Sequence, residues 1–113
     1  MKPEQIEQIK VVEWVKQNTN LKLIYIPNDG KRSPTLGRIL KRMGLYPGTS
    51  DIFMPQSNGK HHGLWIELKV HPNKPTKLQL SFLDDMHSLG YGCAIAYGAE
   101  EAIDCIKAFY GPP

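Results

Sequence analysis

The feature that most constrains the fold of this chain is a predicted β-hairpin that carries acidic and basic side chains. Residues 51–54 and 63–70 are strand-like apolar segments, and the Asn58-Gly59 pair between them favours a tight connection. A Gly-containing turn at residues 47–50 precedes the first of these strands. The sequence therefore predicts a sheet with at least two neighbouring antiparallel strands at its centre.

Helices and further strands are expected on both sides of this hairpin. Hydrophobic spacing predicts helices at residues 3–17, 34–43, 77–89 and 99–109, and strands at residues 21–26 and 92–97. Ser33 and Thr76 are predicted helix N-caps, and Gly44 and Gly90 are predicted to end the two helices that follow them. The order α-β-α-β-β-α-β-α predicts an α/β fold, in which helices cover the faces of a mixed sheet.

Length and composition indicate one globular domain over residues 1–113. The hydrophobic fraction is 41% and the charged fraction is 22%, which are ordinary values for a globular protein. No apolar run approaches the ~20 residues of a membrane span, and the polar N-terminus is unlike a signal peptide. We therefore expect a cytoplasmic protein that is not bound to membranes. Cys93 and Cys105 are expected to be reduced, buried thiols.

Two carboxylates and one amine on the hairpin form the strongest candidate site. Antiparallel pairing can place Asp51 beside Glu67, and Lys69 shares a face of its strand with Glu67 because the residues are two apart. Two acids so close require a compensating cation, and oxygen ligands suit Mg²⁺ or Mn²⁺. The backbone carbonyl of Leu68 is a further candidate ligand. A Glu-x-Lys pair alone is typical of a solvated strand face, but Asp51 behind the turn favours a site.

The chemistry expected of this group is hydrolysis of a phosphodiester bond. The metal would lower the pKa of an attacking water, and Lys69 would orient that water or stabilise charge in the transition state. Gln79, on the next helix, is a candidate to contact the water, Lys69 or a phosphate, although a single Gln is more often a surface residue. An acid on the first helix is a further candidate metal ligand, although the pattern alone favours solvent-exposed helix charges.

A basic cluster precedes and enters the second predicted helix. It contains no acid, and its members are Lys31, Arg32, Arg38, Lys41 and Arg42. A solvated helix face and a surface that contacts phosphates are both compatible with this pattern. The net charge of +3 is too small to decide between them.

An ordered set of short motifs over almost the whole chain resembles a known family. These motifs are Glu4-x-x-x-Gln8 with Trp14, Ile26-Pro27-Asn28 with Gly30 and Arg32, Gly37-Arg38-x-Leu40-Lys41-x-x-Gly44, Pro47-Gly48-x-Ser50-Asp51-Ile52-Phe53, Ile66-Glu67-Leu68-Lys69, Gln79 and Gly90-Tyr91. In this order they are similar to the stand-alone VRR-NUC domains of phages and bacteria. These domains belong to the PD-(D/E)XK nuclease superfamily.

The resemblance implies a restriction-endonuclease-like αβββαβ core and DNA cleavage that depends on a divalent metal. It assigns Asp51, Glu67 and Lys69 to the signature positions of the superfamily, and Gln79 to the position on the following helix. Glu4 is implied as the first-helix acid, with Glu7 as its rival. Ser50 departs from the pattern, because it stands where the superfamily has proline. That position shapes the turn and holds no metal, so we expect activity to survive.

The resemblance also implies a substrate class and an assembly. Related small domains resemble Holliday-junction resolvases and form homodimers, and a larger relative prefers flaps, so branched DNA is the expected substrate. The alternative is a catalytically silent module that binds branched DNA on the same fold. A structural protein without enzymatic activity is a third class. The intact Asp51, Glu67 and Lys69 argue against the catalytically silent module.

Overall fold

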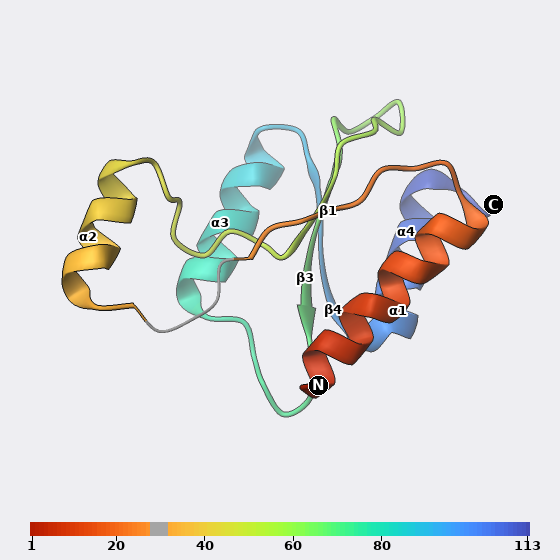
Figure 1. Ribbon diagram of the computed structural model, residues 1–113. Helices are drawn as coiled ribbons and strands as arrows, with labels where there is room; N and C mark the ends of the chain where they lie inside the picture. The colour runs from red at the N-terminus through yellow and green to blue at the C-terminus, as the bar shows by residue number, and fades with distance from the viewer. Residues whose placement is uncertain (28–31) are drawn as a thin grey trace.

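The computed structural model describes residues 1–27 and 32–113. The described elements follow each other as α1 (Pro3–Asn18), β1 (Ile24–Tyr25), α2 (Pro34–Arg42), β2 (Ile52–Met54), β3 (Leu64–Lys69), α3 (Lys77–Ser88), β4 (Gly92–Tyr97) and α4 (Gly98–Tyr110) (Figure 1). This is the predicted order of helices and strands. The prediction of a strand over residues 21–26 was too long, because only Ile24 and Tyr25 pair with β2. Leu21 and Leu23 pack against the core instead.

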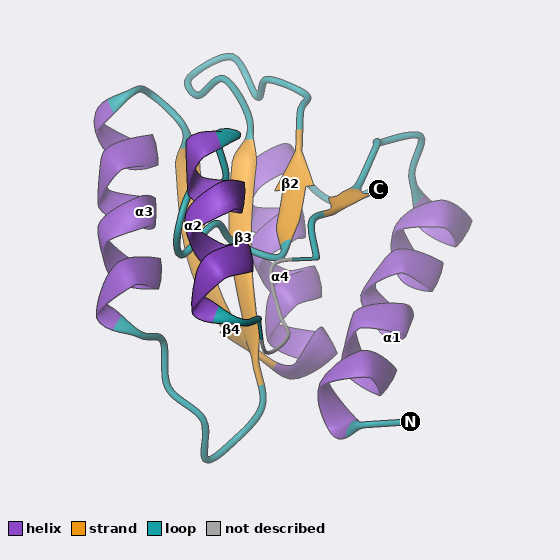
Figure 2. Cartoon of the chain, turned by 60° about the vertical axis from the view of Figure 1, so that its left-hand side comes forward, coloured by secondary structure: helices purple, strands orange, loops and turns teal. Residues whose placement is uncertain are grey.

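The sheet is mixed, as expected, and its strands lie in the order β1-β2-β3-β4. β2 pairs antiparallel with both β1 and β3, whereas β3 pairs parallel with β4. α3 makes the connection from β3 to β4, because parallel neighbours need a crossover element. Figure 2 shows α3 on one side of the sheet, and α1 and α4 on the other.

The two faces of β3 bury different kinds of side chain. Ile66 and Leu68 are fully buried in the core that α1 and α4 cover. Trp65 points to the other face, where its ring lies 4.3 Å from that of Phe53 and 4.9 Å from that of Phe82 on α3. Because side chains alternate along a strand, Glu67 and Lys69 share the α3 face with Trp65.

The predicted starts of α2 and α3 are confirmed by their caps, and the other ends of the four helices lie within one residue of the prediction. The Ser33 hydroxyl accepts a hydrogen bond from the Leu36 N–H at 3.1 Å at the start of α2, and Thr76 caps α3 in the same way. Gly44, which follows α2, has a φ of 104°, a conformation that glycine adopts most easily.

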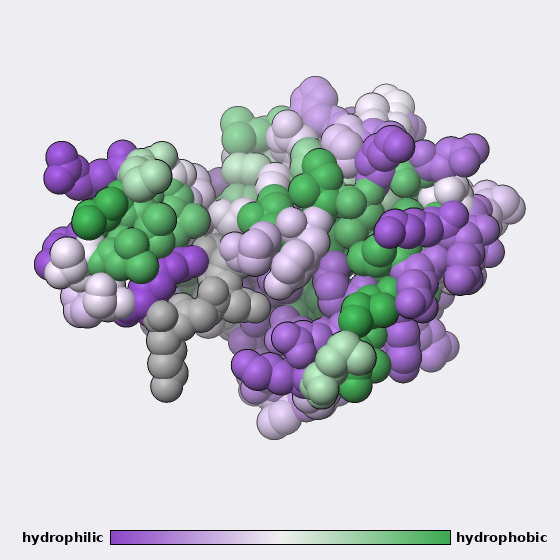
Figure 3. Space-filling view, viewed as in Figure 1, coloured by the Kyte–Doolittle hydropathy of each residue, from purple (hydrophilic) through white to green (hydrophobic). Residues whose placement is uncertain are grey.

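α2 stands apart from the rest of the molecule (Figure 1). None of its residues is buried, and no other described helix or strand packs against it. Its apolar side chains Leu36, Ile39 and Met43 are 46%, 47% and 76% exposed. Figure 3 shows an apolar patch over α2, with hydrophilic groups beside it.

None of the helices in the described parts of the chain is long and apolar enough to cross a bilayer. Both cysteines are free, as expected, but they are only partly buried. Burial raises the pKa of the Cys93 thiol to about 11, so it stays protonated at neutral pH.

Candidate active site

The register between β2 and β3 brings the two predicted acids together. Ile52 lies opposite Ile66, and one further step along the two strands places Asp51 opposite Glu67. Both side chains are buried, with exposed fractions of 5% for Asp51 and 1% for Glu67. The predicted convergence of the two carboxylates is therefore present, and it lies on the face of the sheet that carries α3.

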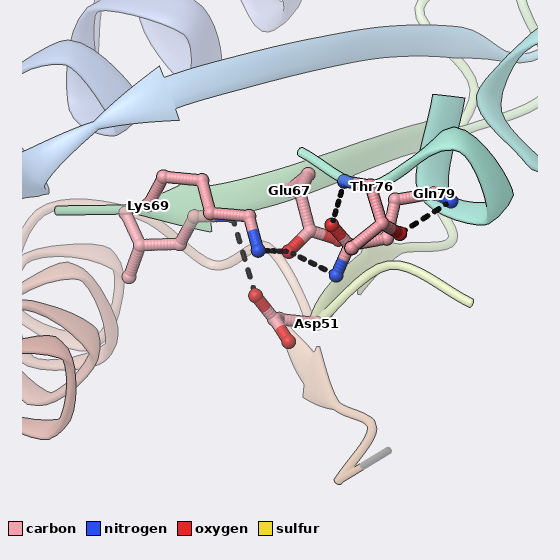
Figure 4. Close-up of polar contacts among 6 residues, drawn as sticks. Asp51, Glu67, Lys69, Thr76 and Gln79 are labelled. Carbon is pink, nitrogen blue, oxygen red and sulfur yellow. Dashed lines mark hydrogen bonds and ion pairs between the residues drawn. The ribbon is translucent and has the colours of Figure 1, made fainter. Parts of the chain in front are cut away.

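Lys69 and Gln79 complete the cluster (Figure 4). The Lys69 Nζ lies 3.5 Å from Oε2 of Glu67, and the Gln79 Nε2 donates to the same oxygen at 3.3 Å. Oδ2 of Asp51 accepts a hydrogen bond from the Leu68 N–H at 3.3 Å. Side chains from β3 and α3 and the residue before β2 thus meet at one point.

The electrostatics of this cluster favour an added positive charge. Burial, and next the neighbouring Asp51 carboxylate, raise the pKa of Glu67 to about 8, while Lys69 acts in the opposite direction. One ammonium is therefore not enough to keep both acids ionised at neutral pH. Either a proton or a bound cation must be shared between them.

The donor set fits a divalent cation. Oε1 of Glu67 is buried and has no hydrogen-bond partner among the described residues, whereas Oε2 is held by Lys69 and Gln79. A carboxylate oxygen that is buried and unpartnered is costly unless a proton or a cation meets it. Among residues 1–27 and 32–113, no group of three or more His, Cys, Asp or Glu side chains is placed so that it could hold a metal ion. Asp51 and Glu67 would thus hold Mg²⁺ or Mn²⁺ with water, and the role of the Leu68 carbonyl stays a prediction.

The turn before Asp51 is fixed against α3. Gly48 has a φ of 81°, and a Cβ at this position would lie 2.3 Å from the Leu78 carbonyl oxygen. Only glycine permits this approach, which ties the turn carrying Asp51 to the first turn of the helix carrying Gln79. Ser50 is fully buried, and its hydroxyl has no partner among the described residues. The turn is thus not held by a hydrogen bond of the Ser50 hydroxyl to any described residue.

A cavity of about 270 Å³ extends from Asp51 towards α2. Asp51, Thr76 and Gln79 line one part of its wall, and Arg32 and Lys41 line another. Two members of the predicted basic cluster thus lie beside the candidate site.

The other members of the basic cluster are placed differently. Arg38 and Arg42 are exposed on α2 and do not line this cavity. Arg38 donates a hydrogen bond to the Thr35 hydroxyl at 3.4 Å. Lys31 lies outside the described residues. The sequence pattern did not distinguish the basic residues that line the cavity from those that do not.

The two first-helix acids have different surroundings. Oε1 of Glu7 accepts a hydrogen bond from the Ala99 N–H at 3.0 Å, at the start of α4, and Oε2 lies 3.0 Å from the Lys10 Nζ. These contacts lower the pKa of Glu7. Glu4 is partly buried in the first turn of α1. Its assignment as a metal ligand stays a prediction.

A second cavity, of about 370 Å³, lies where the start of α1 meets the ends of β3 and β4. Ile6, Glu7, Val70 and Tyr97 are among the residues that line it. Glu4 lines neither cavity.

One residue of the site was predicted only as a helix cap. Thr76 lines the cavity beside Asp51 and forms a reciprocal capping box with Gln79. Its N–H donates to Oε1 of Gln79 at 2.9 Å, and its hydroxyl accepts from the Gln79 N–H at 3.2 Å. The sequence signal was present, because Thr76-x-x-Gln79 is the spacing of a capping box.

Comparison with known proteins supports the fold. No family model matches the chain, and no curated protein matches it. A solved structure described as "VRR_NUC domain protein" superposes with a TM-score of 0.82. It is 23% identical to this chain, and the match covers 96% of this chain and 88% of the other. The mixed sheet, its flanking helices and their order are thus those of a known domain. The chain therefore has the fold of a VRR_NUC domain protein.

Proposed function

We propose that this protein is a DNA endonuclease that depends on Mg²⁺ or Mn²⁺ and hydrolyses phosphodiester bonds. The observation that carries the proposal is the meeting of two buried carboxylates, one with an unpartnered oxygen, beside the Lys69 ammonium. The name of the structurally similar protein supports a nuclease-type function. Acids and an ammonium in this arrangement suit metal-assisted hydrolysis of a phosphate ester.

Each residue of the proposed active site has a separate role. Asp51 and Glu67 hold the cation, which when bound lowers the pKa of water and neutralises phosphate charge. The Lys69 ammonium orients the attacking water and stabilises charge that develops on the phosphate in the transition state. Gln79 holds Glu67 in place through its hydrogen bond to Oε2. Glu4 remains a candidate to complete the metal site from α1.

The basic residues hold the DNA backbone. Arg32 and Lys41 reach phosphates next to the scissile one, because they line the same cavity as Asp51. Arg38 and Arg42, which are exposed on α2, contact phosphates further along the strand, and Lys31 is proposed to join them. The preferred substrate is branched DNA such as a Holliday junction or a flap.

The active assembly is a homodimer. The exposed stripe of Leu36, Ile39 and Met43 is unpacked within the described chain, and an isologous contact between two copies would bury it. Two active sites related by a two-fold axis would match the symmetry of a DNA branch.

The experiment that tests the function is a cleavage panel. Branched and linear DNAs are incubated with the wild type in Mg²⁺, Mn²⁺ or EDTA, and with Lys69→Ala. We expect metal-dependent cutting by the wild type and at least a ~100-fold loss of rate in Lys69→Ala, because the ammonium acts on the reacting phosphate. Folding and DNA affinity should stay near the wild-type values.

Lys60→Ala provides a matched control, since it removes the same charge from an exposed loop at the other end of β3. It should cut as the wild type does. Full activity in Lys69→Ala would remove this lysine from the mechanism. DNA binding without any metal-dependent cutting would instead favour the alternative, a catalytically silent module that binds branched DNA.

A further inference from the structure

We propose that the capping box at the start of α3 is a positioning device that selects the metal-binding oxygen of Glu67. Thr76 is the positioning residue, and it acts through Gln79. The inference rests on the proposed metal site, and it assigns Oε1 of Glu67 as the ligand atom. It also gives Thr76 a part in the site beyond ending a helix.

The Gln79 amide is bound at both ends. Its Oε1 accepts from the Thr76 N–H at 2.9 Å, and its Nε2 donates to Oε2 of Glu67 at 3.3 Å (Figure 4). Turning the amide over would set NH₂ against an N–H and a carbonyl oxygen against a carboxylate. Both contacts would then be repulsive, so the capping box admits one orientation, with the NH₂ group directed at Glu67.

That orientation determines how Glu67 is held. Oε2 receives both the Gln79 NH₂ group and the Lys69 ammonium, which lies at 3.5 Å. Oε1 is buried and has no partner among the described residues. A carboxylate with one oxygen held by two donors cannot exchange its two oxygens without losing both contacts. Oε1 is consequently the atom left for a cation.

The Thr76 hydroxyl keeps the capping box closed. It accepts from the Gln79 N–H at 3.2 Å, which fixes the helix start relative to the Gln79 side chain. The same turn is held from outside by Gly48, where a Cβ would meet the Leu78 carbonyl oxygen. Loss of the hydroxyl therefore frees the Thr76 N–H to move away from Oε1 of Gln79, and the amide loses its fixed direction.

Metal affinity is the direct test, and it needs no DNA. Mn²⁺ binding to the full chain is measured by calorimetry for the wild type, Thr76→Ala and Thr76→Ser. We expect Thr76→Ala to raise the Kd about 10-fold, at the low end of the range for residues that orient metal ligands, and Thr76→Ser to restore it. Gln79→Glu keeps an oxygen for the capping box but has no donor for Glu67, so its Kd should rise by about 10–100-fold.

Two control variants separate positioning from stability. Ser33→Ala removes an N-cap hydroxyl of the same kind from α2. Ile106→Val removes one buried methyl group from α4, on the opposite face of the sheet, and its stability loss is comparable to that of a lost cap. Both should bind Mn²⁺ as the wild type does. An equal loss of affinity in Ile106→Val and Thr76→Ala would mean that Thr76 acts only through stability.

NMR of the Gln79 side-chain NH₂ group gives a readout that does not require metal. Its two protons should be distinct and protected from exchange in the wild type, Thr76→Ser and Ser33→Ala, and averaged in Thr76→Ala.

Unchanged Mn²⁺ affinity in Thr76→Ala would overturn the inference. If the wild type binds no Mn²⁺, the proposed metal site fails. In that case, an ordered NH₂ signal that is lost in Thr76→Ala would still support the inference that Thr76 positions Gln79 against Glu67. A mobile NH₂ signal in the wild type would overturn that inference.

Discussion

At the scale of single residues, the close approach of the Asp51 and Glu67 carboxylates lowers the stability of the protein and favours the binding of a cation. Each carboxylate is almost fully buried, and Lys69 supplies only one compensating charge. Burial of like charges is unfavourable unless a proton or a cation intervenes. The stability of the protein should therefore depend on both pH and divalent metal.

The first prediction at this scale concerns pH. The pKa of Glu67 is raised to about 8 in the folded state, from an ordinary value of 4.5. The contribution of Glu67 to the free energy of unfolding is thus fully present below pH ~4.5, and it is lost as the pH rises through about 8. In EDTA, the melting temperature of Glu67→Gln should exceed that of the wild type by an amount that grows from pH 5 to pH 9. A gain of about 4 °C or more at pH 9 is expected.

A divalent metal should offset the loss of wild-type stability at high pH. Mg²⁺ binds the ionised carboxylate, so it should raise the wild-type melting temperature more at pH 9 than at pH 6. Na⁺ at matched ionic strength serves as the control. Parallel pH profiles for the wild type and Glu67→Gln would contradict the raised pKa of Glu67.

At the scale of elements, the contact between the 47–50 turn and α3 holds the candidate site together. Gly48 lets the turn approach the Leu78 backbone, and this approach sets Asp51 beside the helix that carries Gln79. The acids come from the sheet, and the residues that hold Glu67 come partly from α3. The site therefore depends on how closely these two parts pack.

Gly48→Ala should damage both stability and metal binding. The left-handed backbone alone costs about 1–2 kcal/mol for an alanine, and the clash with the Leu78 carbonyl adds to it. Gly59→Ala is the matched control, because Gly59 has a φ of 92° but open space around its Cβ position. Chemical denaturation should show a larger loss of unfolding free energy in Gly48→Ala. Equal losses in the two variants would mean that the close approach contributes nothing.

Sequence patterns predicted most of the elements because their signals are local. Caps such as Ser33 and Thr76 act within one turn, and the apolar alternation of residues 63–70 marks a strand by itself. The strand over residues 21–26 was predicted too long, because strand length depends on a partner far along the chain.

The site was predictable in the same measure. Asp51, Glu67 and Lys69 follow from strand register, which pattern and turn largely fix. Three features were not visible in the sequence, because they arise from tertiary packing. These are which members of the basic cluster line the cavity, the unpartnered oxygen of Glu67 and the closeness of Gly48 to Leu78.

At the scale of the whole molecule, the distribution of charge matters more than its total. The net charge is only +3, but Arg32 and Lys41 lie in the wall of the cavity that holds Asp51. Phosphate contacts release counterions, so DNA affinity should fall with salt. The protein as a whole is expected to bind DNA through a surface that begins at this cavity and extends over α2.

Lys41→Ala tests that surface. The slope of log Kd against log salt concentration should decrease by about 1, as expected for one lost phosphate contact, and binding should weaken for all DNA sequences alike. Lys16→Ala on α1 is the control, because α1 covers the opposite side of the sheet. An unchanged slope in Lys41→Ala would place the DNA elsewhere.

The proposed homodimer gives a prediction at the same scale. Ile39→Glu puts a charge in the middle of the exposed apolar stripe of α2 and should turn the dimer into a monomer, as measured by light scattering. Arg38→Glu places the same acidic group on the same helix, about 100° or more around its axis from Leu36, Ile39 and Met43, and should leave the assembly intact. A monomeric wild type would contradict the dimer.

The isolation of α2 has a further consequence for its own order. A helix of nine residues that no other described element supports depends on its caps and on whatever molecule it meets. Its backbone amides should exchange with solvent fastest among the four helices of the described chain in the free protein, and slow down when DNA or a second copy is added. α2 would then become fully ordered only when it contacts DNA or a second copy of the chain, so binding and local folding would occur together.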